Sequence, residues 1–352
     1  MSRVYDSWEK LVGAVLDREE LRRLALCDSF SSSIYSDFSF DSAAASSRQS
    51  NSSSRESNFL RRVVRPIELK EIIKATSNFQ NDMLIGQGVL CQAFKAWIDE
   101  HTLIASEPGS GMAVAVKRWY NNLERHQDWL KEIDYLVQLH HPNLVDLLGY
   151  CTEKGNMILV YEFMPEGNLE QRLFTNSRHQ PLPWAMRTKV ALDVARGLFY
   201  LHDREIPIIH RDFNSANIFL DAELNAKLSN YCYGTDDHSP VLTGQVFIKF
   251  GYTAPEYTSK GQLSAKSNVY AYGAVLSELL SGIPASNVKR VRPYFSKKKK
   301  VLEIMDKRLE GQYSDDAAYE FAKLALKCLS VDPKSRPTMA DVLLALQHIP
   351  RP

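Results

Sequence analysis

One stretch in the second half of the chain reads His210-Arg211-Asp212-Phe213-Asn214-Ser215-Ala216-Asn217. An aspartate placed to act as a general base, with an asparagine five residues later that can bind a metal, suits phosphoryl transfer. Taken alone, such a stretch often occurs by chance. It indicates a fold only together with other motifs that follow a fixed order on both sides of it.

Two motifs precede this stretch. The first is a glycine loop between two predicted strands, Ile85-Gly86-Gln87-Gly88. Glycines allow backbone N–H groups to approach phosphates closely. In the predicted strand 112–117, Ala113, Ala115 and Lys117 share one face, because side chains alternate along a strand. Small alanines beside a lysine suit a flat ring packed on the sheet, and Glu132 on the next predicted helix can pair with Lys117.

Two further motifs follow it, Ala254-Pro255-Glu256 and Arg336. Each motif is weak alone, but their ordered occurrence in one chain is highly specific. On these motifs the chain resembles the protein kinases over roughly residues 66 to 348. The resemblance implies ATP and magnesium as ligands, with Asp212 at the position of the base and Lys117 and Glu132 as catalytic residues.

Four further segments are residues 94–103 (FKAWIDEHTL), 108–111 (PGSG), 141–145 (HPNLV) and 159–164 (LVYEFM). They resemble the plant receptor-like cytoplasmic kinases of the immune-signalling subfamily VII. The resemblance implies plant receptor kinases or other signalling proteins as partners, and a cytoplasmic location, at the plasma membrane through those partners. Family members reach the membrane by an acylated N-terminus, whereas Ser2 follows Met1 here, so N-myristoylation is not expected.

The pattern along the chain predicts an α+β fold of two unequal lobes, because short strands come first and helices follow. Strands are expected within 84–98, 112–119 and 158–161, and helices within 124–139, 185–202, 265–281, 317–329 and 339–349. The resemblance gives this the form of the bilobal protein-kinase fold. It implies a small N-lobe with an antiparallel sheet and one helix, and a larger, mainly helical C-lobe.

Composition divides the chain into four segments. Residues 1–27 place apolar side chains at helical spacing, which predicts an amphipathic helix that docks on the main domain or binds a partner. Residues 28–60 are rich in serine and lack apolar periodicity, which predicts a disordered linker. The kinase N-lobe and hinge are expected at 61–164, and the C-lobe at 165–352.

Charge and apolar content exclude some classes of protein. The net charge is +1, which argues against a dedicated nucleic-acid binder. The five cysteines are scattered without a C-x-x-C pair, which indicates a reducing compartment. The best apolar stretch, 157–164, is too short to cross a bilayer and contains Glu162, so no transmembrane segment is expected.

The resemblance assigns nucleotide binding to residues of the loop, the strands and the hinge: Ile85, Gly86, Gly88, Ala93, Ala115, Lys117, Glu162, Met164 and Phe219. Two of these depart from the family pattern, because Ala93 replaces a valine and Phe219 a leucine of the layers around the ring. The smaller side chain on one side of the ring (Ala93) and the larger one on the other side (Phe219) can compensate for each other in volume. Alternatively, Phe219 fills part of the pocket and weakens nucleotide binding. The sequence leaves both alternatives open, and with them the binding of ATP.

The metal position departs further from the family. An Asp-Phe-Gly triplet should follow Ser229, but the chain continues Asn230-Tyr231-Cys232. Magnesium prefers hard, anionic oxygen ligands, and Asn230 offers a neutral amide oxygen. Asn217 and Asn230 therefore form a degenerate metal site.

Other replacements lie close to the chemistry. Cys91 stands at the third loop glycine, where its side chain is expected to intrude near the phosphates. Asn214 replaces a lysine that neutralises the transferring phosphoryl group, and Lys249, which stands in place of a threonine, can restore that charge. Asn268 replaces an aspartate that accepts hydrogen bonds from the catalytic loop. One arm of an amide donates, so the loop is expected to be held less firmly.

These departures favour a catalytically inactive pseudokinase that acts as a scaffold in plant receptor or immune signalling. The alternative is a weakly active serine/threonine kinase that transfers the γ-phosphoryl group of ATP to protein hydroxyls, because Lys117, Glu132, Asp212 and Asn217 are all present. In the activation segment, which the resemblance places at residues 230–256, Ser239 and Thr243 are candidate regulatory sites for an upstream kinase, although each is also an ordinary polar loop residue.

Overall fold

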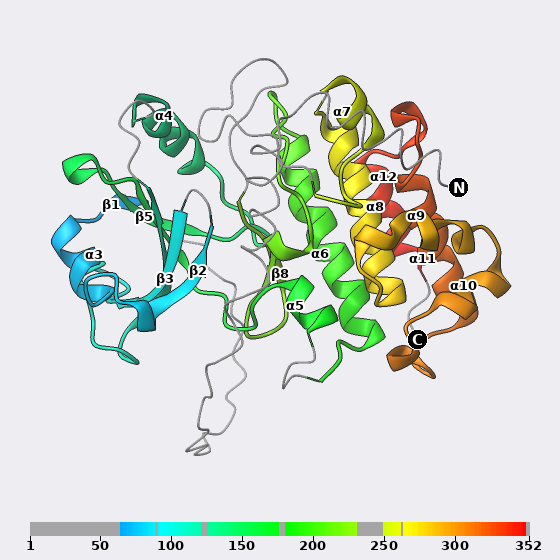
Figure 1. Cartoon of the computed structure of the whole chain (residues 1–352), viewed down its shortest axis with the longest axis horizontal. Coiled ribbons are helices and arrows are strands. Elements are labelled where there is room, and N and C mark those ends of the chain that lie inside the picture. The colour runs from blue at the N-terminus through cyan, green and yellow to red at the C-terminus, as the bar shows by residue number, and fades with distance from the viewer. Residues whose placement is uncertain are drawn as a thin grey trace, which may run out of the picture.

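The computed structural model describes residues 64–88, 91–120, 126–175, 180–230, 249–261 and 263–349. The predicted helix at 1–27 and the predicted linker at 28–60 lie outside these residues. Within them, a part built on a sheet is followed by a part built mainly of helices (Figure 1). This arrangement confirms the predicted α+β, bilobal fold.

A six-stranded sheet forms the N-terminal part. Its strands are β1 (Arg65–Pro66), β2 (Leu84–Gln87), β3 (Cys91–Ile98), β4 (Met112–Trp119), β5 (Leu147–Cys151) and β6 (Ile158–Glu162). In the order β1-β5-β6-β4-β3-β2, neighbours are antiparallel except β1, which is parallel to β5. The sheet is therefore mixed, whereas the sequence predicts an antiparallel one. With two residues, one of them a proline, β1 has no periodicity by which to find it.

Within the described residues, two helices accompany this sheet, rather than the one expected. The predicted helix is α4 (His126–Leu136), which buries Trp129 and Ile133. The additional helix is α3 (Leu69–Ala75), which buries Leu69 and Ile72. At about two turns it is too short for its apolar spacing to stand out in the sequence.

The C-terminal part contains the remaining helices. They are α5 (Leu169–Phe174), α6 (Trp184–His202), α7 (Pro255–Lys260), α8 (Ala265–Ser281), α9 (Val288–Val291), α10 (Lys298–Ile304), α11 (Asp315–Cys328) and α12 (Met339–Gln347). Nearly every residue of α8 is buried, as expected of a helix surrounded by others. Gly273 allows α11 to pack closely on α8, since a Cβ there would lie 2.7 Å from the Cβ of Cys328.

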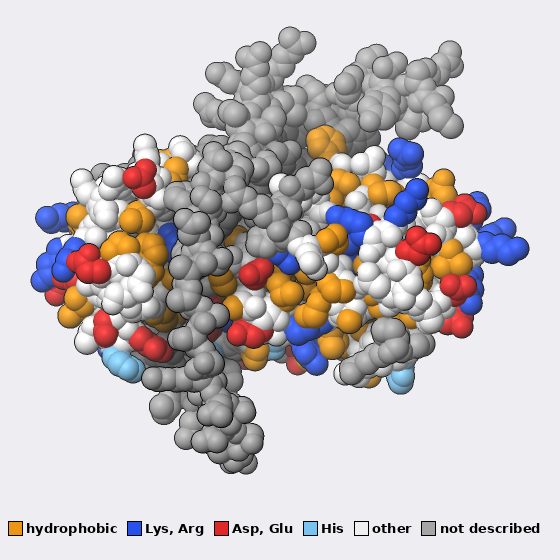
Figure 2. Space-filling model, turned by 90° about the horizontal axis from the view of Figure 1, so that it is seen from below, with side chains coloured by type: hydrophobic (Ala, Val, Ile, Leu, Met, Phe, Trp, Pro, Cys, Tyr) orange, Lys and Arg blue, Asp and Glu red, His pale blue; other side chains and the backbone are white. Residues whose placement is uncertain are grey.

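A small two-stranded sheet, β7 (Ile218–Leu220) with β8 (Ala226–Leu228), lies between the large sheet and α6 (Figure 1). Two backbone hydrogen bonds of 2.9 Å, from Val145 to Leu228 and from Leu228 to Asn143, tie it to the segment that follows α4. On the face shown in Figure 2, acidic and basic side chains of the described residues are interspersed, in keeping with the net charge of +1.

Candidate active site

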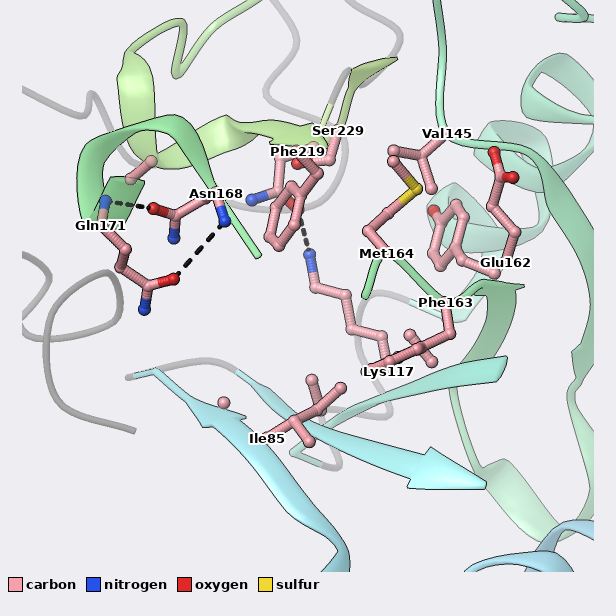
Figure 3. A pocket seen from close by; sticks show the side chains of 16 residues that line it. Ile85, Lys117, Val145, Glu162, Phe163, Met164, Asn168, Gln171, Phe219 and Ser229 are labelled. Atoms are coloured by element: carbon pink, nitrogen blue, oxygen red, sulfur yellow. Dashed lines mark hydrogen bonds between the residues drawn. The ribbon is translucent and has the colours of Figure 1, made fainter. Parts of the chain in front are cut away.

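A cleft lies between the large sheet and the β7–β8 sheet. It is lined by Ile85, Gly86, Ala93, Ala115, Lys117, Val145, Tyr161, Glu162, Phe163, Met164, Asn168, Gln171, Ala216, Phe219, Ser229 and Asn230. Ile85 and Phe219 lie on opposite sides of it (Figure 3). The empty space is about 920 Å³, including the open mouth. Small-molecule pockets are mostly apolar, and most of the side chains that line this cleft are apolar too, so it has the character of a ligand site.

Strand pairing explains why the predicted residues meet. Ala93 of β3 stands opposite Lys117 of β4, and Ala115, two residues before Lys117, shares its face. Phe219 of β7 lines the other side of the cleft without closing it. The cleft is therefore not closed by Phe219, and the compensation in volume between Ala93 and Phe219 stays a prediction.

Two loop residues differ from expectation. Gly88 is absent from the lining, and its N–H donates to the carbonyl of Cys91 at 2.8 Å. Cys91 is 8% exposed at the start of β3 and lies in the sheet rather than among the lining residues. Burial raises the pKa of its thiol. The expected intrusion of Cys91 is therefore not found, because its side chain does not line the described cleft.

Glu162 lines the cleft, but its carboxylate is committed elsewhere. The side chain points away from Phe219 (Figure 3). Its Oε1 accepts from Lys227 Nζ at 2.6 Å and from the Asp146 N–H at 2.8 Å. Burial raises the pKa of Glu162, and the charge of Lys227 acts in the opposite direction. Glu162 is therefore one half of an internal ion pair and not a free charge at the cleft.

Several lining residues were not singled out from the sequence: Val145, Tyr161, Phe163, Asn168, Gln171, Ala216 and Ser229. Asn168 and Gln171 alone carry a recognisable signal, because their spacing is that of a capping box at the start of α5. The Gln171 N–H donates to Asn168 Oδ1 at 2.9 Å, and the Asn168 N–H donates to Gln171 Oε1 at 3.4 Å (Figure 3). This cap holds both amides at the mouth of the cleft.

A chain of hydrogen bonds links the strand lysine to the aspartate of the catalytic loop. Lys117 Nζ donates to Asn230 Oδ1 at 2.6 Å, and Asn230 Nδ2 donates to Asn217 Oδ1 at 2.6 Å. Asn217 Nδ2 donates in turn to the carbonyl and to Oδ2 of Asp212, at 2.7 and 2.8 Å. We call these four residues the amide ladder. An aspartate at 230 would have no N–H to donate to Asn217, so the ladder depends on the asparagine.

Asp212 is held from a second side by Asn214. Asn214 Nδ2 donates to Asp212 Oδ1 at 2.8 Å, while Asn214 Oδ1 accepts the N–H of Ala216 at 2.9 Å. Burial raises the pKa of Asp212, although hydrogen bonds from Asn217 and Asn214 and the charge of Lys249 oppose the shift. Both carboxylate oxygens therefore already accept amide hydrogen bonds.

Lys249 brings a cation to this loop from a distant segment. Its Nζ lies 3.2 Å from Asn214 Oδ1 and 3.1 Å from Glu170 Oε1 of α5. Asn214 stands where the family has a lysine. The ammonium group of Lys249 therefore lies beside Asn214 while it forms an ion pair with Glu170, and its replacement of the lost lysine stays a prediction.

Asn268 holds the catalytic loop with both arms of its amide. Its Oδ1 accepts the His210 N–H at 2.8 Å, and its Nδ2 donates to the His210 carbonyl at 2.7 Å. The expectation that an amide here would hold the loop less firmly overlooked the carbonyl that the second arm reaches. Burial lowers the pKa of His210 to about 4, so the ring is neutral near pH 7, and its Nε2 lies 2.8 Å from the Ser229 carbonyl.

Comparison with known proteins bears directly on this geometry. The model of the protein tyrosine and serine/threonine kinase family matches residues 79–346, which is most of the chain. The chain belongs to the protein kinase family. Members of this family generally act on ATP with magnesium ions.

Individual relatives place this kinase-family chain among the plant receptor-like cytoplasmic kinases. It is 49% identical over 294 residues to probable serine/threonine-protein kinase PBL3 of Arabidopsis thaliana, covering 79% of the chain and 68% of the relative. It is 45% identical over 302 residues to serine/threonine-protein kinase BIK1 of the same plant, covering 81% and 76%. Receptor-like cytoplasmic kinase 176 of Oryza sativa subsp. japonica is 45% identical over 304 residues, with the same coverage.

A solved structure with a similar fold is the pseudokinase domain of BIR2, an immune regulator of the RLK/Pelle family. The TM-score is 0.67 at 30% identity, covering 80% of this chain and 86% of that one. The three relatives named above carry the names of kinases, whereas the BIR2 structure carries the name of a pseudokinase domain. Similarity therefore establishes the family and leaves catalytic competence to the residues of the site.

The kinase-family chain contains a buried ion pair between Arg336 and Glu256. Arg336 is 2% exposed and makes two hydrogen bonds of 2.7 Å to the two carboxylate oxygens of Glu256. Burial opposes the ionised form of Glu256, but hydrogen bonds, foremost those from Arg336, outweigh it and lower the pKa of this carboxyl. The pair joins the start of α7 to the segment before α12.

A buried acid, Glu278 of α8, contacts the catalytic loop (residues 210–217) through Tyr252. Its Oε1 accepts from the Tyr252 hydroxyl at 2.7 Å and from the Ala285 N–H at 2.8 Å. The Tyr252 hydroxyl also lies 2.7 Å from Ser215 Oγ in the loop. Glu278 Oε2 has no hydrogen-bond partner among the described residues. Burial raises the pKa of Glu278 to about 7, with the hydrogen bonds acting against it.

Glu278→Gln is expected to flatten the pH dependence of stability between about pH 4.5 and 7. The folded pKa lies above the ordinary one, so the folded chain keeps a proton that the unfolded chain releases. The stabilisation is therefore complete below pH 4.5 and lost as the pH rises through about 7, by at most about 1.4 kcal/mol per pH unit. Urea denaturation at a series of pH values measures this slope. Glu310→Gln, at an exposed acid, is the control, and an unchanged slope in Glu278→Gln would contradict the assignment.

The residues present fit the two usual kinase ligands unequally. The apolar walls around Ile85, Ala115 and Phe219 suit the base of a nucleotide. The metal position offers the amides of Asn217 and Asn230, and the described residues contain no group of three or more histidine, cysteine or acidic side chains that could hold a metal ion. Magnesium prefers carboxylate and phosphate oxygens, so this donor set does not fit it.

Some predicted features fall outside what the structure describes. Glu132 lies within α4, but its side chain is not among those described, so its pairing with Lys117 stays a prediction. Ser239 and Thr243 lie in the segment 231–248, which is also not described. Among the helices that the structure describes, none is long and apolar enough to cross a membrane.

Proposed function

We propose that this chain is a kinase-fold scaffold in plant receptor or immune signalling that transfers phosphoryl groups very slowly or not at all. It works in the cytoplasm and reaches the plasma membrane through plant receptor kinases or other signalling proteins, which its activation segment and C-lobe contact. Membership of the receptor-like cytoplasmic kinases supports the signalling role. The N-terminal segment 1–27 is a second candidate surface for such partners.

One observation carries the loss of transfer: the amide ladder occupies the metal position. Asn217 Oδ1 accepts from Asn230, and Asn230 Oδ1 accepts from Lys117. Both oxygens are neutral and already hydrogen-bonded. In phosphoryl transfer, metal ions bridge the phosphates and neutralise the developing charge. This site has the amide of Asn230 in place of the carboxylate that would hold the metal ions.

The test is to incubate the purified full chain with γ-labelled ATP, with magnesium and separately with manganese. Asp212→Ala serves as the control, and circular dichroism shows that both proteins are folded. We expect no labelling of protein above the control. Labelling that disappears in Asp212→Ala would mean that Asp212 still works as a base, and an active kinase would replace the scaffold.

A slow serine/threonine kinase is the second candidate, and specific observations favour it. Relatives that match 79% and 81% of the chain carry the names of serine/threonine kinases. In the site, Asp212 occupies the position of the base, and Lys249 Nζ stands 3.2 Å from Asn214 Oδ1. A cation near the transferring group stabilises the charge that develops there.

If this second candidate is correct, Lys249→Ala is expected to lower the residual labelling by about 100-fold, because it removes the cation beside Asn214. Lys260→Ala, at an exposed lysine of α7, is the matched control and should leave labelling unchanged. Equal labelling in Lys249→Ala and the unmodified chain would show that Lys249 does not replace the lost lysine.

Phosphorylation of Ser239 and Thr243 by an upstream kinase is proposed to switch partner binding. A phosphoryl group adds about two negative charges at pH 7, which is enough to order or displace a segment. Alanine at both positions is expected to remove the difference in partner affinity between phosphorylated and unphosphorylated protein. The affinity is measured for the unmodified chain and for the double alanine variant, each with and without treatment by the upstream kinase. The same affinity in all four samples would refute the switch.

A further inference from the structure

The part of the cleft that would hold a metal ion and the part that would hold the base of a nucleotide differ in how well they suit their ligands. In the amide ladder, each oxygen that the family would use for a metal already binds a hydrogen-bond donor of the protein, at 2.6 Å in both cases. A metal ion would have to displace these donors and shed tightly held water for two neutral ligands. Magnesium dehydrates reluctantly and is usually bound through carboxylates and phosphates.

The walls that would take a base and ribose are intact. Ile85, Ala93 and Ala115 form one side and Phe219 the other, with Met164 between the two parts of the chain. The cleft is open to solvent, and the side chains on both of its sides are apolar, as is typical of a site for a small organic ligand. Nothing in this apolar part depends on a metal.

Lys117 supplies positive charge to the same cleft. Of the charged residues in the lining, Glu162 is already paired with Lys227 at 2.6 Å. Lys117 meets the neutral amide of Asn230, and its Nζ lies 4.7 Å from the centre of the Trp119 ring. Among the side chains that the structure describes, neither contact cancels the charge of the ammonium group. An anionic phosphate can therefore form a charge-assisted hydrogen bond with Lys117 directly.

We propose that this cleft binds adenosine nucleotides without a divalent metal, through its apolar walls and Lys117. The inference rests on the proposed absence of metal-assisted transfer and names the ligand of that same site. Bound nucleotide would then stabilise the fold that partners recognise, because a ligand that binds only the folded state raises its stability. The nucleotide acts here as a structural ligand and undergoes no reaction.

The experiment measures thermal unfolding and calorimetric binding of the full chain with adenosine, ADP and ATP, each in EDTA and in magnesium. We expect the dissociation constants of ADP and ATP to agree within about twofold between EDTA and magnesium. Affinity that falls about tenfold or more in EDTA would overturn the proposal, and so would the absence of binding in both conditions. In that last case the proposed scaffold still stands, because it is tested separately by labelling.

Lys117→Met tests the role of the lysine. Loss of a hydrogen bond to a charged group is expected to weaken ATP binding by about tenfold or more, while adenosine binding stays within about twofold. Lys323→Met removes a lysine far from the cleft and is the control. Unchanged ATP binding in Lys117→Met, or equal losses for ATP and adenosine, would overturn the assignment of Lys117. Circular dichroism confirms folding, and Ile85→Ala, which weakens all three ligands together, provides a second variant should Lys117→Met be unfolded.

Discussion

Asn230→Asp is expected to make this chain respond to magnesium. The aspartate removes the N–H that Asn217 Oδ1 accepts at 2.6 Å and adds one negative charge beside that freed oxygen. Two unit charges 4 Å apart interact by about 4 kcal/mol at an effective dielectric near 20, before desolvation is subtracted. Even half of this corresponds to more than a tenfold change in affinity. We therefore expect magnesium to tighten ATP binding by about tenfold or more in the variant, and to have no such effect in the unmodified chain.

The same substitution should raise magnesium-dependent labelling by about 100-fold, because an anionic ligand would fix the metal that stabilises the transferring group. Calorimetry in EDTA and in magnesium, and labelling with γ-labelled ATP, measure the two effects. Asn287→Asp makes the same chemical change at an exposed residue and is the matched control. If the unmodified chain already bound ATP more tightly with magnesium, and to the same extent as Asn230→Asp, the amide ladder would not be what limits metal binding.

Arg336→Met is expected to destabilise the fold by about 3–5 kcal/mol, the typical cost of leaving one partner of a buried ion pair without the other. The Arg336 side chain is fully buried and that of Glu256 is 11% exposed. Besides both oxygens of Glu256, the guanidinium group binds the carbonyl oxygens of Ser330 and Lys266, at 2.7 and 2.8 Å. Methionine fills much of the same volume but satisfies none of these acceptors.

Urea denaturation of Arg336→Met, followed by circular dichroism, gives the change in the free energy of unfolding. Adding Glu256→Gln to Arg336→Met should recover part of the loss, because the stranded carboxylate is then removed. Lys323→Met is the control, since Lys323 pairs with Glu320 at the surface and exposed pairs contribute little. A loss below about 1 kcal/mol in Arg336→Met would contradict the importance of this pair.

Long, strongly patterned elements could be located from the sequence. The bounds of β4 (Met112–Trp119) and α8 (Ala265–Ser281) agree with the ranges expected from periodicity. Short elements with little pattern were missed, for example β1 of two residues and α3 of seven. These short segments are held by the rest of the fold, for example by the pairing of Arg65 with Gly149, and not by a preference that can be seen locally.

The sequence alone establishes the family, the order of the motifs and the identity of the side chains at each position of the site. It also showed that Asn230 is a poor metal ligand, since that follows from the chemistry of an amide. Which donor meets which acceptor depends instead on how distant segments fold together. Lys117 and Asn230 are 113 residues apart, and Lys249 and Glu170 are 79 apart.

Asn268 shows the limit most clearly. Its amide was correctly expected to accept with one arm and donate with the other, but the consequence depended on a carbonyl lying 2.7 Å from the donating arm. The same holds for Asn230, whose Nδ2 finds Asn217 Oδ1 within reach. A hydrogen bond weakens steeply as its distance and angle depart from their narrow optimum. Whether a polar group is satisfied is therefore set by the relative placement of distant segments, which composition and spacing do not contain.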